Sequence, residues 1–423
     1  MSAPHLTPRE AATWVAARLR AAGHRALFAG GCVRDLLLGR EPADFDVATS
    51  ATPEQIRAIF PRAIGVGESF GVMLVRHGGR SVETATFRAD AEYADGRRPT
   101  GVRFTDDRED ALRRDFTING LFEDPQTGEV IDHVGGRADL AAGILRAIGD
   151  PEARLREDRL RSLRAVRFAA RFGLRIDPAT EAAVRRFGPE LAGVSRERIG
   201  NEVRRMLVHP TRTRAVELAD SLGLASPILN EPPVETELER LRGLPAEAPL
   251  EAALAAWMLG RAADGRTHRA CPQEPPHAED SRARCRRWRD ALVLSNEESQ
   301  GLEAALAVRT RVACEWADAP VARRKRLAAA EGFACARLLL AAEGWGHAAA
   351  MGAELEELAR TGIQPPPLVT GDDLVAMGLA PGPAFRPLLD ALYDRQLEGA
   401  LADRESALAA ARALAARPPT GGT

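Results

Sequence analysis

The decisive stretch of this sequence is Phe28-Ala29-Gly30-Gly31-Cys32-Val33-Arg34-Asp35, which is followed by Asp44-Phe45-Asp46. A short apolar strand enters the glycine turn and a helix begins after it. The turn therefore presents backbone N–H groups at a helix N-terminus, where an anion can bind. Side chains two positions apart on a strand face the same side, so Asp44 and Asp46 can share divalent metal. This order of elements predicts a metal–triphosphate site on an α/β unit.

Two interpretations of this stretch are open. Two aspartates two positions apart are, on their own, equally typical of a surface turn. The preceding turn favours phosphate binding, because Gly31 permits close backbone approach and Arg34 can clamp phosphate oxygens. Arg34 can instead form a local ion pair with Asp35. We predict nucleotidyl transfer, with Asp44 and Asp46 bridging Mg²⁺ ions.

The surrounding residues predict a small α/β unit. Periodicity indicates strands over 26–29, 44–48, 72–75 and 82–86, and helices over 8–22, 33–38 and 53–60. His77-Gly78-Gly79-Arg80 is typical of a hairpin turn between the last two strands. Glu83 alternates on the second hairpin strand as a third carboxylate would, although a solvent-facing Glu fits equally well. The first ~140 residues are therefore expected to form a mixed sheet with helices.

The sequence changes character from Pro151 onward, where strand patterns give way to helices. Helices are predicted over 151–172, 178–187, 195–208, 211–222, 235–242, 248–263, 280–291, 296–308, 320–342 and 345–360. Residues 266–281 are polar and Pro-rich, which predicts a surface loop. Gln364-Pro365-Pro366-Pro367 is a rigid break before a last unit over 368–416.

Bulk composition restricts the class of protein. A chain of 423 residues exceeds one typical core, so several domains are expected. The net charge of -2 demands no nucleic-acid partner, although a neutral total can hide a basic face. Lys325 is the only lysine; this bias is typical of a GC-rich genome, and Arg also suits bidentate phosphate contacts. The five scattered cysteines lack a CxxC pair, and no signal or membrane-length apolar run is present, so we expect a cytoplasmic protein without membrane association.

Two further polar elements precede the helical part. Arg113-Arg114-Asp115-Phe116-Thr117-Ile118-Asn119-Gly120 offers Asp115 as an acceptor for ribose hydroxyls and Arg114 as a phosphate ligand. Asp115 is equally suited to cap a helix, and capping does not exclude catalysis. The second element, over 132–140, is a Gly-rich turn that enters a helix. It is more typical of a hinge than of a ligand site, and we interpret its His133 as structural.

The most unusual element is the charged run over 157–167. In the predicted helix one face is charged and comprises Asp158, Arg161, Arg164 and Arg167. The opposite face is apolar and comprises Leu160, Leu163, Val166 and Ala170. A solvated amphipathic helix is the usual explanation. The alternative is that Asp158 accepts from the exocyclic amine of C or A while Arg161 donates to the ring atoms beside it. That pair fits C and A but does not match U or G.

In order and spacing these four elements resemble the class II tRNA nucleotidyltransferases, the CCA-adding enzyme and bacterial poly(A) polymerase family of the polymerase β superfamily. The resemblance is dense over 25–208. It implies an α+β fold, with a polymerase-β-like nucleotidyltransferase head on a mixed sheet followed by an all-α neck, body and tail. The expected divisions are a catalytic head over 1–145, a base-recognising neck over 146–208, a body over 209–310 and a tRNA-anchoring tail over 311–423.

The resemblance also implies roles for individual residues. Catalysis would fall to Asp44, Asp46 and Glu83, with Mg²⁺ held by the two aspartates. Nucleotide binding would fall to Gly30, Gly31, Arg34, Arg114, Asp115, Asn119, Asp158, Arg161, Arg164 and Arg167. Of these, Asp158 and Arg161 would be the amino-acid template for CTP and ATP. Beyond residue 208 the match is loose, although segments at 370–374, 381–383 and 396–399 are similar to a family tail that contacts the tRNA elbow.

The segment over 88–104 bears on which reaction is catalysed. It is polar, and Gly96 and Pro99 predict a mobile loop. In the family a flexible loop here accompanies addition of the terminal A. We therefore rank full CCA addition to tRNA, from CTP and ATP, above addition of A alone. Poly(A) polymerase ranks third, because those relatives usually carry strongly basic extensions and this chain does not.

Other classes of protein fit less well. An inactive RNA-binding protein on this fold would need the arginines but not Asp44 and Asp46. A metal-dependent nucleotide phosphohydrolase would need no base-reading helix. The sequence does not distinguish a monomer from a homodimer.

Overall fold

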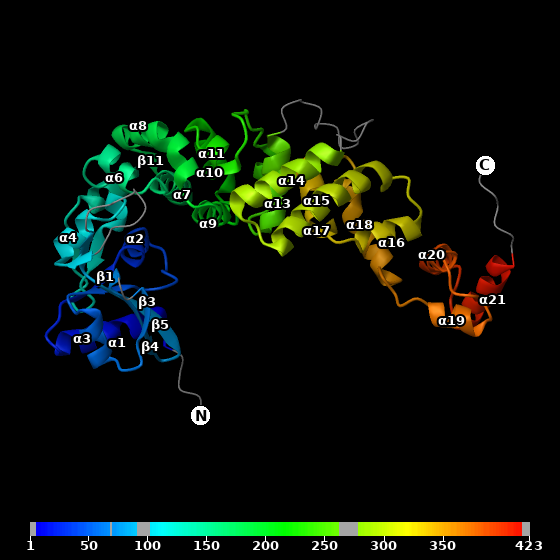
Figure 1. The fold of residues 1–423 in the computed structure, drawn as a ribbon, viewed down its shortest axis with the longest axis horizontal. Helices are drawn as coiled ribbons and strands as arrows, with labels where there is room; N and C mark the ends of the chain where they lie inside the picture. Colours follow the sequence, from blue (N-terminus) through cyan, green and yellow to red (C-terminus); the bar gives the residue numbers. More distant parts are fainter. Residues whose placement is uncertain (1–5, 68–69, 91–101, 262–277, 417–423) are drawn as a thin grey trace. The chain divides into compact units, whose positions relative to one another are not determined.

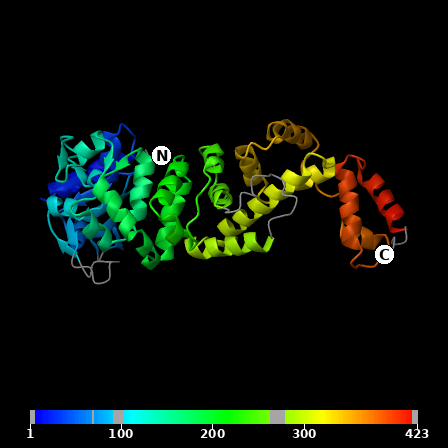
Figure 2. The same ribbon diagram turned by 90° about the horizontal axis from the view of Figure 1, so that it is seen from above.

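A computed structural model describes residues 6–67, 70–90, 102–261 and 278–416 of the chain (Figures 1 and 2). The chain divides into two compact units. The first comprises residues 1–206 and 214–233, and the second comprises residues 207–213 and 234–423. The predicted division into head, neck, body and tail remains a prediction.

The first unit is built on a seven-stranded mixed sheet in the order β3-β4-β5-β2-β1-β8-β9. Its strands are β1 (Ala26–Ala29), β2 (Val47–Thr49), β3 (Ile64–Gly67), β4 (Val72–His77), β5 (Arg80–Thr86), β8 (Leu121–Glu123) and β9 (Val130–Asp132). The β2–β5 pair is parallel and the other neighbours are antiparallel. The mixed sheet is thus confirmed, although β3, β8 and β9 were not predicted.

The helices α1 (Pro8–Ala21) and α3 (Pro53–Ile59) pack against this sheet (Figure 1). Each begins with a threonine capping box and a proline in the first turn. Val15 and Leu19 of α1 lie in one core with Phe28 of β1 and Val82 of β5. This packing fixes which face of each strand is buried, and so which side chains point to the other face.

The predicted hairpin between β4 and β5 is confirmed. His77 pairs with Arg80 across a two-residue turn, in which both glycines have positive φ (53° and 75°). Leu74 lies opposite Glu83, and Arg76 lies opposite Ser81. The segment over 88–104 was predicted as a mobile loop, but its two ends form a second pair of short antiparallel strands, β6 (Arg88–Asp90) and β7 (Val102–Phe104). Gly96 and Pro99 themselves lie outside the described residues.

The remainder of the first unit is mainly helical. It comprises α2 (Gly31–Leu37), α4 (Asp107–Leu112), the 3-10 turn η2 (Thr117–Asn119), α5 (Gly136–Ala141), α6 (Pro151–Glu157), α7 (Arg161–Phe172), α8 (Pro178–Phe187), the 3-10 segment η3 (Gly188–Gly193), α9 (Arg196–Leu207), α10 (Arg212–Ser221) and α11 (Ala225–Leu229). Two short strands, β10 (Ile144–Leu145) and β11 (Arg175–Ile176), pair in parallel among them. The single helix predicted over 151–172 is wrong: it is broken at Asp158, whose backbone is extended (φ −148°, ψ 104°).

The second unit is helical over its described residues. Its helices are α12 (Glu239–Gly243), α13 (Leu250–Gly260), α14 (Ala278–Leu292), α15 (Asn296–Glu315), α16 (Val321–Ala328), α17 (Phe333–Ala342), α18 (Ala348–Arg360), α19 (Gly371–Ala376), α20 (Phe385–Leu397) and α21 (Arg404–Ala415). The predicted helix over 320–342 is divided, because Gly332 adopts φ 82° against the backbone of α15, where a Cβ would lie 2.6 Å from the Ala304 carbonyl carbon. Most of the loop predicted over 266–281 lies outside the described residues.

Lys325 is buried in α16 and donates to the Thr361 hydroxyl (2.8 Å). The last three helices enclose a small apolar core around Leu374, Leu392 and Ala411, and Figure 2 shows α20 beside α21. Among the described residues, no helix combines the length and apolar character that a membrane crossing requires.

Gly136, at the start of α5, provides a test of the packing in the first unit. A Cβ on this residue would lie 2.2 Å from the carbonyl oxygen of Thr117. Gly136→Ala must push α5 away from η2, so we expect a loss of about 1–3 kcal/mol in the free energy of unfolding, measured in urea. The matched control is Gly193→Ala, where no atom lies within 4 Å of the added Cβ. Equal stability of the two variants would contradict this account.

Candidate nucleotidyl-transfer site

The turn after β1 is shaped by Gly30. It adopts φ 70°, and its N–H donates to the Leu121 carbonyl (2.9 Å). A Cβ on Gly30 would lie 2.7 Å from Nη1 of Arg114, so glycine lets this guanidinium approach the backbone. Gly31 is the first residue of α2. The turn and the helix N-terminus therefore follow the predicted order, with Arg114 beside them.

Asp44 and Asp46 lie just before β2 and not within a strand over 44–48 as predicted. The Ala29 N–H donates to the carbonyl of Asp46 (3.1 Å), so the pairing of β1 extends to this residue. Burial, followed by the charges of Glu83 and Asp44, raises the pKa of Asp46 to about 7, and the Arg114 cation opposes that rise. The three carboxylates thus interact electrostatically, and the pairing of Val47 with Thr84 places Glu83 beside Asp46.

The carboxylates suit a magnesium ion that is completed by a substrate. Among the described residues, no group of three or more His, Cys, Asp or Glu side chains is arranged to hold a metal. Mg²⁺ is commonly held by one or two carboxylates together with water and substrate phosphates. A divalent cation between Asp44 and Asp46 would offset the repulsion that raises the Asp46 pKa. These residues therefore fit the ion.

Asp115 is a buried carboxylate with every acceptor position used. Its Oδ1 accepts from the Phe116 N–H (2.8 Å) and from Nδ2 of Asn119 (3.0 Å). Its Oδ2 accepts from Nε (2.8 Å) and Nη2 (2.6 Å) of Arg164. Burial alone would raise the pKa of Asp115. The charge of Arg164 and the hydrogen bonds from Asn119, Arg164 and the Phe116 N–H lower it to about 2. Asp115 is not a helix cap here, since the N-cap of η2 is Phe116. Its contact with Arg164 connects the turn before η2 to α7.

Arg34 is held from three sides. Its Nη1 donates to Oδ1 of Asn119 (2.6 Å), and its Nη2 lies 2.7 Å from Oδ1 of Asp35. The guanidinium also lies 4.2 Å from the centre of the Phe172 ring. The local ion pair that the sequence left open is therefore present. Because Asn119 also binds Asp115, a chain of hydrogen bonds connects Arg34 to Arg164.

Arg114 lies between the turn and α4. Its Nη2 pairs with Oδ2 of the buried Asp110 (3.0 Å), and its Nη1 donates to the Asn119 carbonyl (3.1 Å). Its guanidinium also lies 5.0 Å from the ring centre of Phe122. From this position the positive charge of Arg114 interacts with Asp46 and can attract an anion at the Gly30 turn.

The structure separates the two predicted base-reading residues. Arg161 is the first residue of α7, whereas Asp158 lies in the extended link before it, so they do not share a helix face. Asp158 Oδ2 accepts from Nη2 of Arg198 on α9 (2.7 Å), and its Oδ1 accepts from the Leu160 N–H. Nη1 of Arg161 pairs with Oε2 of Glu157 (2.6 Å). Each member of the pair is thus oriented by its own partner.

The other two predicted site arginines of α7 are also engaged. Arg164 binds Asp115, and Nε of Arg167 donates to Oε2 of the buried Glu202 (2.5 Å). Glu202 also lies 3.2 Å from Nη1 of Arg205. Arg161 and Arg167 are buried, so α7 is not the solvated amphipathic helix of the simpler interpretation. The apolar face around Leu160, Leu163, Val166 and Ala170 is buried as predicted.

Sequence reasoning missed three residues that orient the site. Glu157 lies in the charged run over 157–167 but was given no role there, and Arg198 and Glu202 were not singled out. Their four-residue spacing on α9 places them on one helix face, which was the available signal. Their partners lie about 40 positions earlier, so no local pattern indicates the pairing. His133, interpreted as structural, pairs with the buried Asp107 (2.7 Å).

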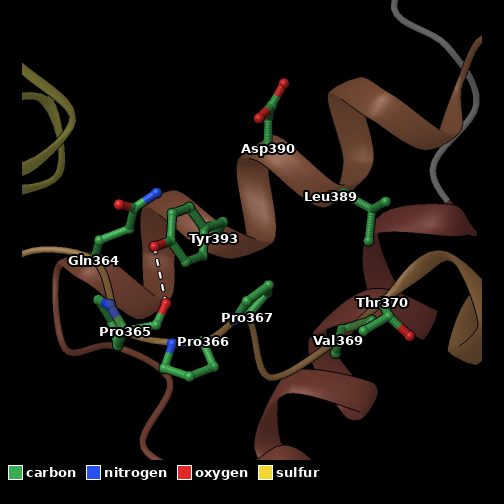
Figure 3. A pocket seen from close by; sticks show the side chains of 9 residues that line it. All are labelled: Gln364, Pro365, Pro366, Pro367, Val369, Thr370, Leu389, Asp390 and Tyr393. Carbon is green, nitrogen blue, oxygen red and sulfur yellow. Dashed lines mark hydrogen bonds between the residues drawn. The ribbon is translucent and has the colours of Figure 1, made fainter. Parts of the chain in front are cut away.

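Figure 3 shows a recess of about 540 Å³ in the second unit, where the prolines at 365–367 face α20. The Tyr393 hydroxyl donates to the Pro365 carbonyl (2.9 Å), which anchors this segment to the helix. None of the predicted site residues lines it. The recess is therefore distinct from the nucleotidyl-transfer residues.

Comparison with known proteins identifies the family. The poly A polymerase head domain matches residues 26–146, and the probable RNA and SrmB-binding site of polymerase A matches residues 173–235. The crystal structure of Bacillus stearothermophilus CCA-adding enzyme in complex with CTP is 30% identical, with a TM-score of 0.76. That match covers 97% of this chain and 98% of the other. The chain belongs to the CCA-adding enzyme and poly(A) polymerase family.

Curated members of this family match about half of the chain. CCA-adding enzyme of Geobacillus stearothermophilus is 44% identical over 218 residues, which is 51% of this chain and 54% of the relative. CCA-adding enzyme of Lactiplantibacillus plantarum is 40% identical over 240 residues, which is 56% of this chain and 58% of the relative. The chain thus spans about half the length of the curated CCA-adding enzymes that it matches. The Thermotoga maritima CCA-adding enzyme, at 19% identity and a TM-score of 0.64, supports the shared fold alone.

The charge on Asp115 is expected to stabilise the first unit in a pH-dependent way. Its folded pKa, about 2, lies below the unfolded value, so the stabilisation is present above roughly pH 4. It is lost as the pH falls towards 2. Asp115→Asn should therefore lose about 3 kcal/mol in the free energy of unfolding at pH 7. Its deficit relative to the unmodified chain should shrink between pH 4 and pH 2, as followed by urea unfolding.

The control for this prediction is Glu129→Gln, which removes the charge of an exposed carboxylate in the same unit. It should leave the stability unchanged at both pH values. A deficit of Asp115→Asn that stays constant from pH 7 to pH 2 would show that the carboxylate charge is not what stabilises the fold.

Proposed function

We propose that this chain is a template-independent tRNA nucleotidyltransferase that adds CCA to tRNA 3′ ends, using CTP and ATP and releasing pyrophosphate. The observation that carries the proposal is the match to the CTP-bound CCA-adding enzyme, which extends over both units of the chain. The geometry supports it, because the three carboxylates and the glycine turn lie on or directly beside strands of one sheet. Arg164 of α7 is also linked through Asp115 and Asn119 to Arg34, which follows that turn.

In this proposal the incoming triphosphate lies at the Gly30–Gly31 turn. Backbone N–H groups at the start of α2 and the Arg114 guanidinium bind its oxygens. Arg34 lies beside them and is pre-oriented by Asn119. The residues that hold Mg²⁺ are Asp44 and Asp46, and the bound ion would stabilise charge on the phosphates and lower the pKa of the attacking hydroxyl. Glu83 orients that hydroxyl from the neighbouring strand.

Base selection falls to Asp158 and Arg161. Asp158 offers an acceptor for the exocyclic amine of C or A, and Arg161 offers donors to the adjacent ring atoms. Arg198 and Glu157 are the positioning residues of this pair. In this proposal Arg167 and Arg164 do not contact the base. Arg167 orients Glu202, and Arg164 orients Asp115.

Two related activities and one non-enzymatic role are the alternatives. An enzyme that adds only the terminal A would use the same template, and a poly(A) polymerase would accept any RNA. An inactive RNA-binding protein would not need the carboxylates that surround Asp46. A cytoplasmic location is part of the proposal and is supported by the free thiols of the four described cysteines. Monomer and homodimer are both compatible with it.

The deciding experiment uses three tRNA transcripts that end before CCA, after C and after CC, incubated with Mg²⁺ and with CTP and ATP separately and together. Extension of all three is expected. Extension of only the CC-ended transcript would indicate A addition, and long tails on any RNA would indicate poly(A) synthesis. Asp46→Ala should abolish incorporation while leaving tRNA affinity nearly unchanged. Undiminished incorporation by that variant would contradict the role assigned to Asp46.

Arg161→Ala is expected to relax the preference for C and A over U and G. Removing its bidentate contact should lower the discrimination in kcat/KM about 10-fold or more, since such a contact contributes about 1–3 kcal/mol. The measurement compares incorporation of all four nucleoside triphosphates. The matched variant is Arg167→Ala, which should lower the rate without changing selectivity. Unchanged selectivity in Arg161→Ala would assign Arg161 to phosphate binding or to structure.

A further inference from the structure

The tip of the β4–β5 hairpin carries arginines that the proposed nucleotide site does not use. Arg76, His77, Gly78, Gly79, Arg80 and Ser81 line a recess of about 410 Å³. The exposed guanidinium of Arg76 makes no hydrogen bond, ion pair or ring contact with any described residue. Arg80 donates to the Leu6 carbonyl (2.8 Å) and pairs with no carboxylate of the described residues. The recess therefore presents positive charge that the fold does not neutralise.

The tip is held firmly. The Leu6 N–H donates to the Gly78 carbonyl (3.3 Å), and a Cβ on Gly78 would lie 2.5 Å from Leu6 Cδ1. On α1, the Trp14 ring stacks on His77 with centres 3.6 Å apart and planes at 4°. A hairpin tip usually moves freely, but this one is packed against Leu6 and Trp14. Its arginines are thus presented from a fixed backbone, which lowers the entropy lost on binding.

Arg76 lies on the same face of the sheet as the catalytic carboxylates. It pairs with Ser81, and Glu83 is two positions further along β5, so Arg76 and Glu83 are diagonal neighbours. Side chains in that relation lie about 7–8 Å apart. Glu83 in turn lies beside Asp46, because the residues that follow them, Thr84 and Val47, pair in the parallel β5–β2 ladder. A group bound at Arg76 is therefore one strand away from the reacting centre.

The strand order indicates what that group is. Across the sheet, β4 carries Arg76, β5 carries Glu83, β2 follows Asp46, and β1 leads into the Gly30 turn. The carboxylates thus separate two basic regions, Arg76 on one flank and the Gly30 turn with Arg34 on the other. In nucleotidyl transfer the metal-binding carboxylates lie between the triphosphate and the attacking hydroxyl. With the triphosphate at the Gly30 turn, the acceptor strand must approach from β4.

We infer that the recess at the β4–β5 tip binds a backbone phosphate of the acceptor RNA, close to its 3′ terminal nucleotide. Arg76 is the principal contact, and Arg80, on the opposite face of the hairpin, adds positive charge at the tip. An arginine that is free of carboxylates binds phosphate through charge-assisted hydrogen bonds. The inference rests on the proposed nucleotidyl transfer, because the position of the acceptor follows from it.

The experiment compares Arg76→Ala and the double variant Arg76→Ala/Arg80→Ala with the unmodified full-length chain. The matched control is Arg137→Ala, which removes an exposed guanidinium that follows β9, at the opposite edge of the sheet. We expect the KM for tRNA to rise about fivefold in Arg76→Ala and further in the double variant, with the KM for CTP unchanged. Arg137→Ala should match the unmodified chain. Arg76→Lys should recover much of the loss, because it restores the charge.

The dissociation constant of tRNA without nucleotide is measured in parallel at several salt concentrations. Loss of one contact to single-stranded RNA should reduce the slope of log affinity against log salt by about 0.7. An unchanged slope together with an unchanged KM for tRNA would overturn the inference. A rise in the KM for CTP instead would overturn it as well, by assigning Arg76 to the nucleotide triphosphate. Failure of the unmodified chain to extend tRNA would refute the proposed function alone. RNA binding at the recess would still be tested by the salt dependence of tRNA affinity, which requires no catalysis.

Discussion

A buried negative charge organises the first unit. A carboxylate as enclosed as Asp115 is stable only with donors at each of its lone pairs, and it receives them from its own turn, from Asn119 and from Arg164. These donors belong to segments almost 50 residues apart. The requirement to satisfy one carboxylate therefore brings the end of the α/β part and the start of the helical part into a single network, and Arg34 joins it through Asn119.

The sheet and the helices divide the work of the site. Strand order decides which charged groups are neighbours. Glu83 lies on β5, Asp46 directly precedes its parallel neighbour β2, and the glycine turn follows the next strand, β1. In the helical part each base-reading residue is oriented by a separate ion pair. Arg198 pairs with Asp158, and Glu157 pairs with Arg161. Because these two contacts are separate, a change in one of them need not disturb the other.

Much of the fold was predictable because its signals are local. The Gly30 turn, the His77–Arg80 hairpin and the capped helices α1 and α3 each depend on residues close together in sequence. The short strands β8 and β9 were missed because three residues carry no usable periodicity, and the break at Asp158 was missed because the residues on both sides favour helix. The partners of Asp158 and Arg167 lie on α9, and such distant pairings have no local signature.

The burial of Lys325 has a chemical consequence for the whole surface. The chain's only ε-amino group is enclosed in the second unit, so no lysine is available to contact a nucleic acid or to be acetylated in the folded protein. Apart from histidines, every basic group that can face RNA is a guanidinium, which keeps its proton at any pH at which the protein is folded. Attraction for a polyanion is thus insensitive to alkaline pH and beyond the reach of lysine-directed modification.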